Sequence, residues 1–256
     1  MAELQVDVRP SGIESAVVYA PFDQALETLT KSGYDFISTA QNAQLRIEQG
    51  AKSPVSQNGN WVKEGIVYRP NENPRLVRVS PIISSANDAT QAHRNGKEFY
   101  LVSSQIEQAL ADSIEFPVKN IEIPTKRFGE EALTAYVFGG EKQAQLYGAF
   151  LAEAGIKAMP VWAVDKNHIN KQSEPFARQL WFGRLDGDRS NLGGNYDLDG
   201  GRVRGVRQVS TEGANASQIS TGQGSELYDA GRIAKSLSKL GFSGLEEQLM
   251  KELRRK

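Results

Sequence analysis

The amino-acid sequence predicts an α+β fold, with short mixed or antiparallel strands, a few helices and long loops. Segments with helical and strand-like periodicity follow each other without the regular strand–helix–strand alternation of a doubly wound sheet. The 256 residues include 24 glycines and 39% hydrophobic residues, which is typical of a globular, turn-rich protein with a substantial core. No internal repeat is visible, so we expect a single domain over residues 1–256.

In the first half of the chain, an apolar face predicts a helix over Asp23–Lys31. Gly33 follows, and glycine readily adopts the left-handed conformation that often ends a helix. The polar stretch Ala40–Asn60, interrupted by Gly and Pro, predicts a loop. Three segments rich in β-branched or aromatic residues predict strands: Trp61–Tyr68, Leu76–Val79 and Glu98–Val102.

In the second half, Ser104 and Glu107 fit a capping box, and we expect the helix that they start to end near Asp112. The clearest helix is Glu141–Ala154, which carries an apolar stripe and is followed by Gly155. Strands are expected at Asn120–Ile123, Leu133–Phe138 and Met159–Val164. Two helices, Leu227–Leu240 and Gly244–Arg255, are expected to form a C-terminal helical extension over residues 225–256.

Composition limits the classes of function. The formal net charge of -1 provides no general attraction to nucleic acid or to an anionic membrane. No apolar run reaches membrane-spanning length, and the N-terminus lacks the pattern of a secretory signal peptide. The absence of Cys excludes disulfides and thiolate zinc sites, and two His residues alone cannot form a three-histidine metal site.

One segment differs from the rest of the chain in its composition. Residues 182–207, FGRLDGDRSNLGGNYDLDGGRVRGVR, contain no Lys, Glu, Gln, Met or Trp, although each of these types occurs elsewhere. Small polar residues, Arg and Tyr occupy the segment, separated by single Leu residues and closed by the strand-like Arg202–Arg207. This composition is typical of a surface that binds partners through adaptable hydrogen bonds and aromatic contacts.

The acidic residues of this segment suggest a calcium loop. Asp186, Asp188, Ser190 and Asp197 lie at positions 1, 3, 5 and 12 of an EF-hand-like spacing. Position 6 is Asn191 rather than Gly, and position 12 is Asp rather than Glu. A solvated Asp- and Gly-rich loop is therefore the alternative interpretation.

Two further patterns suggest chemistry. The strand-like segment at residues 202–207 carries Arg202, Arg204 and Arg207, which would face one way and bind phosphates. The alternative is a ladder of arginines that pair with nearby Asp residues. Asp165 and His168 would serve as an orienting carboxylate and a base, or belong to a simple turn. Paired carboxylates of the glycosidase kind remain open, because the sequence does not reveal distances between acids. The polar run around His93 predicts a surface loop.

The order of several motifs resembles a known family. These motifs are Gln143–Tyr147, Met159–Trp162, Gln179–Phe182, Ser190–Gly194 and Arg202–Arg207. They resemble the C-terminal half of C-type-lectin modules of the formylglycine-generating-enzyme type. More narrowly, they are similar to variable proteins of archaeal diversity-generating retroelements. In that family, adenines of a template repeat are miscopied, and the resulting codons cannot encode the five residue types that residues 182–207 lack.

The resemblance implies which positions vary and which hold the backbone. The diversified, solvent-facing ligand-binding positions would be Phe182, Gly183, Asp186, Gly187, Asp188, Arg189, Asn191, Gly193, Asn195, Tyr196, Asp197, Asp199, Gly200 and Gly201. The invariant scaffold would be Trp181, Leu192, Leu198 and residues 202–206. Its apolar members Trp181, Leu192, Leu198, Val203 and Val206 are expected to be buried and to anchor the backbone. The variable ligand-binding segment would thus span about residues 181–207, as the resemblance implies.

The implied function is ligand or receptor binding by a surface that retroelement mutagenesis diversifies, in an archaeon or an archaeal virus. The expected partner is a protein or carbohydrate, for example on a cell surface, with no nucleic acid and no membrane insertion. We expect no cofactor, no metal and no enzyme activity, since the family's oxidase chemistry requires Cys. The missing signal peptide favours a virion surface or the cytoplasm over Sec secretion. A carbohydrate-acting enzyme and a non-diversified virion or structural component are the alternatives.

Overall fold

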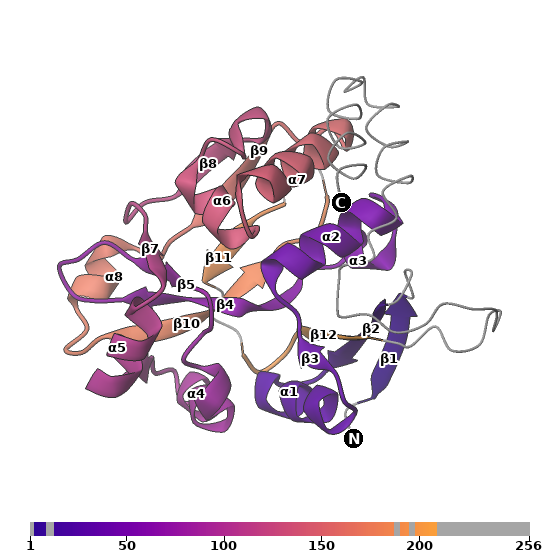
Figure 1. Ribbon diagram of the computed structural model, residues 1–256. Coiled ribbons are helices and arrows are strands. Elements are labelled where there is room, and N and C mark those ends of the chain that lie inside the picture. The colour runs from indigo at the N-terminus through magenta and orange to yellow at the C-terminus, as the bar shows by residue number, and fades with distance from the viewer. Residues whose placement is uncertain (1–2, 9–12, 187–189, 195–197, 209–256) are drawn as a thin grey trace, which may run out of the picture. The chain divides into compact units, whose positions relative to one another are not determined.

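A computed structural model describes residues 3–8, 13–186, 190–194 and 198–208 (Figure 1). The helices are α1 (Phe22–Lys31), α2 (Thr39–Gln49), α3 (Pro54–Gln57), η1 (Ile83–Ser85), α4 (Ala86–Arg94), α5 (Ser103–Leu110), η2 (Thr125–Arg127), α6 (Ala132–Val137), α7 (Glu141–Glu153) and α8 (Lys166–Asn170). The strands are β1 (Leu4–Val8), β2 (Ile13–Tyr19), β3 (Asp35–Phe36), β4 (Asn60–Tyr68), β5 (Arg75–Val77), β6 (Phe99–Tyr100), β7 (Ser113–Glu115), β8 (Ile121–Pro124), β9 (Ala158–Trp162), β10 (Phe176–Phe182), β11 (Leu192–Gly194) and β12 (Arg202–Gln208).

Twelve strands within the described ranges form one mixed sheet. Its main path runs in the order β1-β2-β12-β4-β10-β11-β9-β8, and β3, β5, β6 and β7 extend it by pairing beside this path. The β12–β4 and β11–β9 pairs are parallel, whereas the other pairs are antiparallel. β12, from the unusual segment, therefore lies between β2 and β4, two strands from the first half of the chain.

Helices cover both faces of the central strands, which separate two hydrophobic cores (Figure 1). On β4, Val62 and Ile66 belong to one core, and Trp61 and Val67 belong to the other, because successive side chains of a strand point to opposite faces. Residues of α2, α6 and α7 complete the first core, and residues of α1 and α4 complete the second. The middle of the sheet is thus shielded from solvent on both faces.

Most of the periodic segments form the elements that the sequence predicts. The predicted helices at Asp23–Lys31 and Glu141–Ala154 are α1 and α7, and both Gly33 and Gly155 have positive φ angles. The predicted strands at Trp61–Tyr68, Leu76–Val79, Asn120–Ile123 and Met159–Val164 correspond to β4, β5, β8 and β9, with ends shifted by up to two residues. Only Phe99 and Tyr100 of the segment Glu98–Val102 form a strand.

The prediction of a loop over Ala40–Asn60 is wrong, because α2 and α3 occupy most of it. Ser38 and Gln41 form the capping box that begins α2, with reciprocal hydrogen bonds of 3.2 and 2.9 Å. The buried face of α2 includes the polar Asn42 and Arg46. Polar residues at core positions hide the apolar periodicity from which a helix is usually recognised.

Three smaller predictions need correction. Leu133–Phe138 is not a strand but lies mainly in α6, which packs against α7. The helix expected to start at Ser104 is α5, which begins one residue earlier, and Gln105 rather than Glu107 accepts a hydrogen bond from the Val102 amide. His93 lies in the last turn of α4 rather than in a loop.

The described residues all belong to one compact unit, Met1–Thr211. The predicted helices Leu227–Leu240 and Gly244–Arg255 lie outside the described residues. Within the described ranges, no helix combines the length and apolar character needed to cross a membrane.

Candidate ligand-binding cleft

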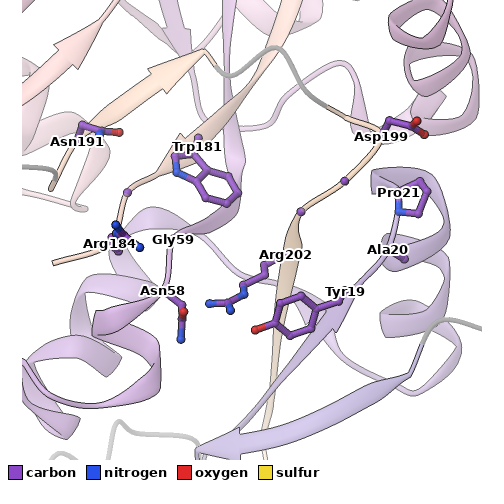
Figure 2. Close-up of a pocket in the computed structure, with 13 residues that line it drawn as sticks. Tyr19, Ala20, Pro21, Asn58, Gly59, Trp181, Arg184, Asn191, Asp199 and Arg202 are labelled. Atoms are coloured by element: carbon purple, nitrogen blue, oxygen red, sulfur yellow. The ribbon is translucent and has the colours of Figure 1, made fainter. Parts of the chain in front are cut away.

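A cleft of about 660 Å³ lies where the ends of four neighbouring strands of the sheet meet (Figure 2). Tyr19 ends β2, Trp181 lies near the end of β10, Arg202 begins β12, and Asn58 and Gly59 lead into β4. The register places Arg202 opposite Tyr19. The other described lining residues are Ala20, Pro21, Gly183, Arg184, Asn191, Asp199, Gly200 and Gly201.

Trp181 forms one wall of the cleft. Its indole packs edge-to-face on Trp61, with ring centres 5.0 Å apart and an interplanar angle of 79°. The backbone of Gly59 lies against the same indole, since a Cβ atom at Gly59 would come within 2.6 Å of it. The predicted role of Trp181 as a buried anchor is therefore only half right, because its side chain is held by packing but remains partly exposed in the cleft.

Arg202 and Tyr19 form a second part of the wall. The guanidinium carbon of Arg202 lies 4.4 Å from the centre of the Tyr19 ring, and Tyr19 is 45% exposed. Figure 2 shows the guanidinium extending between the phenol ring and Asn58. A guanidinium that stacks on an aromatic ring keeps its N–H edges free for hydrogen bonds.

The other charged lining residues form ion pairs. Arg184 pairs with Asp186 at 2.7 Å, and Asp199 pairs with Arg94 of α4 at 2.6 Å. These four side chains are each about one-third to one-half exposed, so the pairs add little stability. They do partly neutralise the charges that these residues bring to the cleft.

A buried arginine supports the wall from behind. Arg46 of α2 donates hydrogen bonds to the carbonyl oxygens of Val55 (3.2 Å) and Asn58 (3.5 Å), and to the Tyr147 hydroxyl (3.1 Å). Its guanidinium also lies 3.9 Å from the centre of the Phe182 ring. Burial lowers the pKa of Arg46. Through these hydrogen bonds and the contact with Phe182, the Arg46 side chain links α2, the segment before β4 and the end of β10.

Glu64 of β4 fixes the start of α2. Its carboxylate accepts hydrogen bonds from the backbone amide and the hydroxyl of Thr39, at 2.9 and 2.8 Å. Burial raises the pKa of Glu64 to about 7, although the hydrogen bonds from Thr39 oppose this effect. The carboxyl group therefore titrates near neutral pH inside the protein.

The structure gathers five of the predicted ligand-binding residues at the cleft. Gly183, Asn191, Asp199, Gly200 and Gly201 line it. Asp186 is exposed and pairs with the lining residue Arg184. Phe182 and Gly193 are described but do not line it. The other six predicted positions, Gly187, Asp188, Arg189, Asn195, Tyr196 and Asp197, lie outside the described residues.

Four positions expected to face solvent are buried, so that expectation is wrong for them. Phe182 is 0% exposed and packs near Phe138 and Tyr147, with ring centres 6.0 and 5.6 Å apart. Gly183 and Gly193 are also buried, and Asn191 is 8% exposed. Gly183 and Asn191 reach the cleft from this buried position. The predicted scaffold residues Leu192, Leu198, Val203 and Val206 are buried as expected.

The glycines of the segment differ in how much they can vary. A Cβ atom at Gly200 would meet open space, and one at Gly193 would make ordinary contact with Trp162. Gly201 has a φ of 154°, and its Cβ atom would lie 2.9 Å from Trp61 Nε1. Substitution at Gly201 is therefore strained, whereas Gly200 accepts a side chain that points outward.

The three arginines of β12 do not share one face as a phosphate grip. Arg204 is buried and donates a hydrogen bond to Ser15 Oγ at 2.7 Å. Arg207 pairs with Glu14 at 2.6 Å, and Arg202 stacks on Tyr19. The alternation of strand side chains separates Arg207 from the other two, so the expectation of a common face is wrong.

Asp165 does not orient the ring of His168. Its carboxylate caps α8 by accepting hydrogen bonds from the amides of Asn167 (2.8 Å) and His168 (3.4 Å). The ring of His168 instead contacts Glu98, with 2.7 Å between Nε2 and Oε1, and Glu98 also pairs with Arg178. The predicted pair of Asp165 and His168 does not form. The buried carboxylate of Glu98 contacts the side chains of His168 and Arg178 instead.

The structure does not bring the predicted calcium ligands Asp186 and Ser190 together, and it does not describe the other two. Asp188 and Asp197 lie outside the described residues, Asp186 pairs with Arg184, and Ser190 is buried. Among the residues that the structure describes, no three His, Asp or Glu side chains are close enough to hold a metal ion together.

Four lining residues, Tyr19, Asn58, Gly59 and Arg184, have no sequence pattern that predicts their role. Tyr19 and Asn58 lie far from residues 182–207 in the chain, and neither has a distinctive motif around it. Their positions depend on strand pairing across the sheet, which local periodicity does not reveal. Arg184 lies inside the unusual segment, but no local pattern distinguishes it from its Gly and Asp neighbours.

Comparison with known proteins supports the fold. No protein-family model and no curated protein matches the chain. A solved structure does resemble it, from work on how the C-type lectin fold accommodates massive sequence variation in Nanoarchaeota. The two share 20% identity with a TM-score of 0.58, over 78% of this chain and all of the other. The fold predicted from the sequence is confirmed: the protein has a C-type lectin fold of the α+β class.

Proposed function

We propose that this protein binds ligands through the cleft, and that a diversity-generating retroelement of an archaeon or archaeal virus changes the codons of residues that line it. The observation that carries the proposal is the composition of the cleft walls. Gly183, Asn191, Asp199, Gly200 and Gly201, from the segment without Lys, Glu, Gln, Met and Trp, line one cavity. The resemblance in fold to a protein with massive sequence variation supports the same function at a coarser level.

The way in which the backbone is held supports variation at the surface. Leu192, Leu198, Val203 and Val206 are buried, and β12 is paired on both sides within the sheet. These contacts do not involve the side chains of Asp186 and Asp199, which are exposed, or the exposed position Gly200. A change at such a position therefore alters the cleft without removing the contacts that hold the fold.

We infer binding rather than catalysis for this cleft. Hydrolysis by paired carboxylates requires two acids about 5 to 10 Å apart across the reacting bond. Among the described lining residues, Asp199 is the one carboxylate, and it pairs with Arg94. The proposed partner is a protein or carbohydrate on a cell surface, with no nucleic acid or membrane insertion. The proposed location of the protein is a virion surface or the cytoplasm.

The genomic surroundings test the origin of the diversity. We expect a near-identical template repeat of the codons for residues 182–207 close to the gene, together with a reverse-transcriptase gene. Differences between the two copies should fall at adenines of the template. A complete genome with neither element would contradict the retroelement origin.

A library tests the tolerance of the cleft. Asp186, Asp199 and Gly200 are randomised together, and Leu192, Leu198 and Val203 are randomised in a matched control library. We expect most variants of the first library to fold, with changes of about 0.5 kcal/mol per site. Most variants of the control library should unfold, since each removes buried apolar contacts worth about 2 to 5 kcal/mol. Equal losses of folded protein in both libraries would contradict the proposal.

A further inference from the structure

We propose that the cleft contains an invariant subsite, formed by Arg202, Tyr19, Asn58 and Trp181, that binds the carboxylate-bearing ring of an acidic sugar. This inference rests on the proposed function for the division between invariant and diversified positions. Tyr19, Asn58 and Trp181 lie outside residues 182–207, and Arg202 belongs to the scaffold of β12. The diversified positions would then select among glycans that share this acidic ring.

The charge of the cleft favours an anion. Arg184 and Asp199 have partners of opposite charge, Asp186 and Arg94. In the described part of the chain, Arg202 has no carboxylate partner and contacts the ring of Tyr19. Its positive charge is therefore left for a ligand.

The buried Arg46 adds a second positive charge to this wall. Its described partners are the neutral oxygens of Val55, Asn58 and Tyr147, and the one at Asn58 belongs to a lining residue. The low polarisability of the protein interior screens this charge weakly, so that its field reaches the cleft. The wall formed by Asn58 and Arg202 is thus more positive than the formal charges of the lining residues alone indicate.

The geometry of Arg202 suits a carboxylate. Its guanidinium is oriented by the Tyr19 ring, with 4.4 Å between the guanidinium carbon and the ring centre. The planar N–H groups of arginine form two parallel hydrogen bonds with a carboxylate, and prior orientation reduces the entropy lost on binding. Figure 2 shows this group directed to the side of the cleft where Asn58 lies.

The neutral lining suits a sugar ring. Trp181 and Tyr19 offer partly exposed aromatic surfaces. Asn58 offers its side-chain oxygen as an acceptor for a hydroxyl, since its Nδ2 group donates to the carbonyl oxygen of Pro54 at 2.9 Å. A volume of about 660 Å³ is within the range of small-molecule sites. Acidic peptide motifs are recognised by clusters of arginines, whereas Arg202 is the one described lining arginine that has no carboxylate partner. The observations therefore favour an acidic sugar over an acidic peptide.

Calorimetric titration of the full chain tests the subsite. The probes are trigalacturonate, the neutral maltotriose and a hexapeptide of glutamate. We expect trigalacturonate to bind with a Kd at or below about 1 mM and to bind more weakly as salt is added. Maltotriose and the peptide should bind at least about tenfold more weakly, which corresponds to 1.4 kcal/mol.

Variants separate the subsite from general effects of charge. Arg202→Gln should weaken the binding of trigalacturonate at least about tenfold, and Arg202→Lys should restore only part of it, because lysine lacks the planar fork. Tyr19→Ala should weaken binding more than Tyr19→Phe does, because phenylalanine keeps the ring on which the guanidinium of Arg202 lies. Arg127→Gln removes the same charge from exposed η2, outside the cleft lining, and should change nothing. Thermal unfolding confirms that each variant is folded.

Several results would overturn the subsite. These are no binding of trigalacturonate at about 10 mM, equal binding of maltotriose, preferred binding of the peptide, or an unchanged Kd for folded Arg202→Gln. Such results would leave the diversified cleft intact as a proposal. Conversely, binding of trigalacturonate by a protein whose gene has no template repeat would support the subsite while contradicting the retroelement origin.

Discussion

At the scale of single residues, the neighbours Trp181 and Phe182 show how far alternation along a strand can guide interpretation. Adjacent strand residues point to opposite faces, so one side chain of the pair was expected inside and the other outside. The structure buries Phe182 beside Arg46 and leaves Trp181 partly exposed in the cleft. Periodicity identifies the two faces of the strand, but the elements that pack on each face decide which face is more buried.

The burial of Phe182 leads to a prediction about stability. Phe182→Ala should lower the free energy of unfolding by about 3 to 5 kcal/mol, because it leaves a cavity in the core. Trp181→Ala should cost less, since the indole is already partly in contact with solvent. Urea denaturation measures both, with Asp186→Ala as an exposed control expected to change stability by less than about 0.5 kcal/mol. A larger loss for Trp181→Ala would show that the assignment of the buried face is wrong.

Two glycines on the same segment should respond in opposite ways to alanine. Gly200→Ala should be tolerated within about 0.5 kcal/mol, because a Cβ atom there meets open space. Gly205→Ala should cost about 1 to 3 kcal/mol, because its Cβ atom would lie 2.7 Å from that of Tyr34. Thermal unfolding compares the two variants, and similar melting temperatures would contradict this contrast.

At the scale of elements, α2 shows why polar residues on a buried face mislead sequence analysis. Its inner side carries Asn42 and Arg46, and Glu64 of β4 binds its first residue, Thr39. These groups form hydrogen bonds that the tertiary structure completes. Ser38 and Gln41 were the available local signal, since their spacing is that of a capping box. α1 and α7 were predictable because their inner faces are mainly apolar.

The raised pKa of Glu64 gives the start of α2 a dependence on pH. The folded pKa of about 7 exceeds the unfolded value near 4.5, so the folded state binds the proton more tightly. The contribution is fully present below about pH 4.5 and is lost as pH rises through about 7, a loss on the order of 3 kcal/mol. Glu64→Gln should remove this slope.

Urea denaturation at pH 5 and pH 8 measures this effect as the difference between wild type and Glu64→Gln. Other groups titrate in the same interval, but they contribute equally to both proteins and cancel in the difference. The gain in stability from pH 8 to pH 5 should be larger for the wild type. Parallel pH profiles for the two proteins would exclude a buried, protonated Glu64.

At the scale of the whole molecule, the sheet unites parts of the chain that lie far apart in sequence. β12 is paired with β2 on one side and β4 on the other, and β10 pairs with β4. The ends of four neighbouring strands therefore lie together, and the cleft forms at these strand ends. A surface built on a central, doubly paired strand tolerates changes at its exposed positions, because sheet pairing depends on the backbone.

The sequence by itself determined the α+β class, the buried anchors Leu192, Leu198, Val203 and Val206, and the segment whose composition suits a binding surface. These properties are local, since they follow from periodicity and from residue types within one stretch of chain. Only the tertiary structure decided that Tyr19, Asn58 and Trp181 share a cleft with Arg202, and that Phe182 belongs to the core. The physical reason is that pairing register and the packing of α2 and α7 set these neighbours, and both depend on contacts between distant residues.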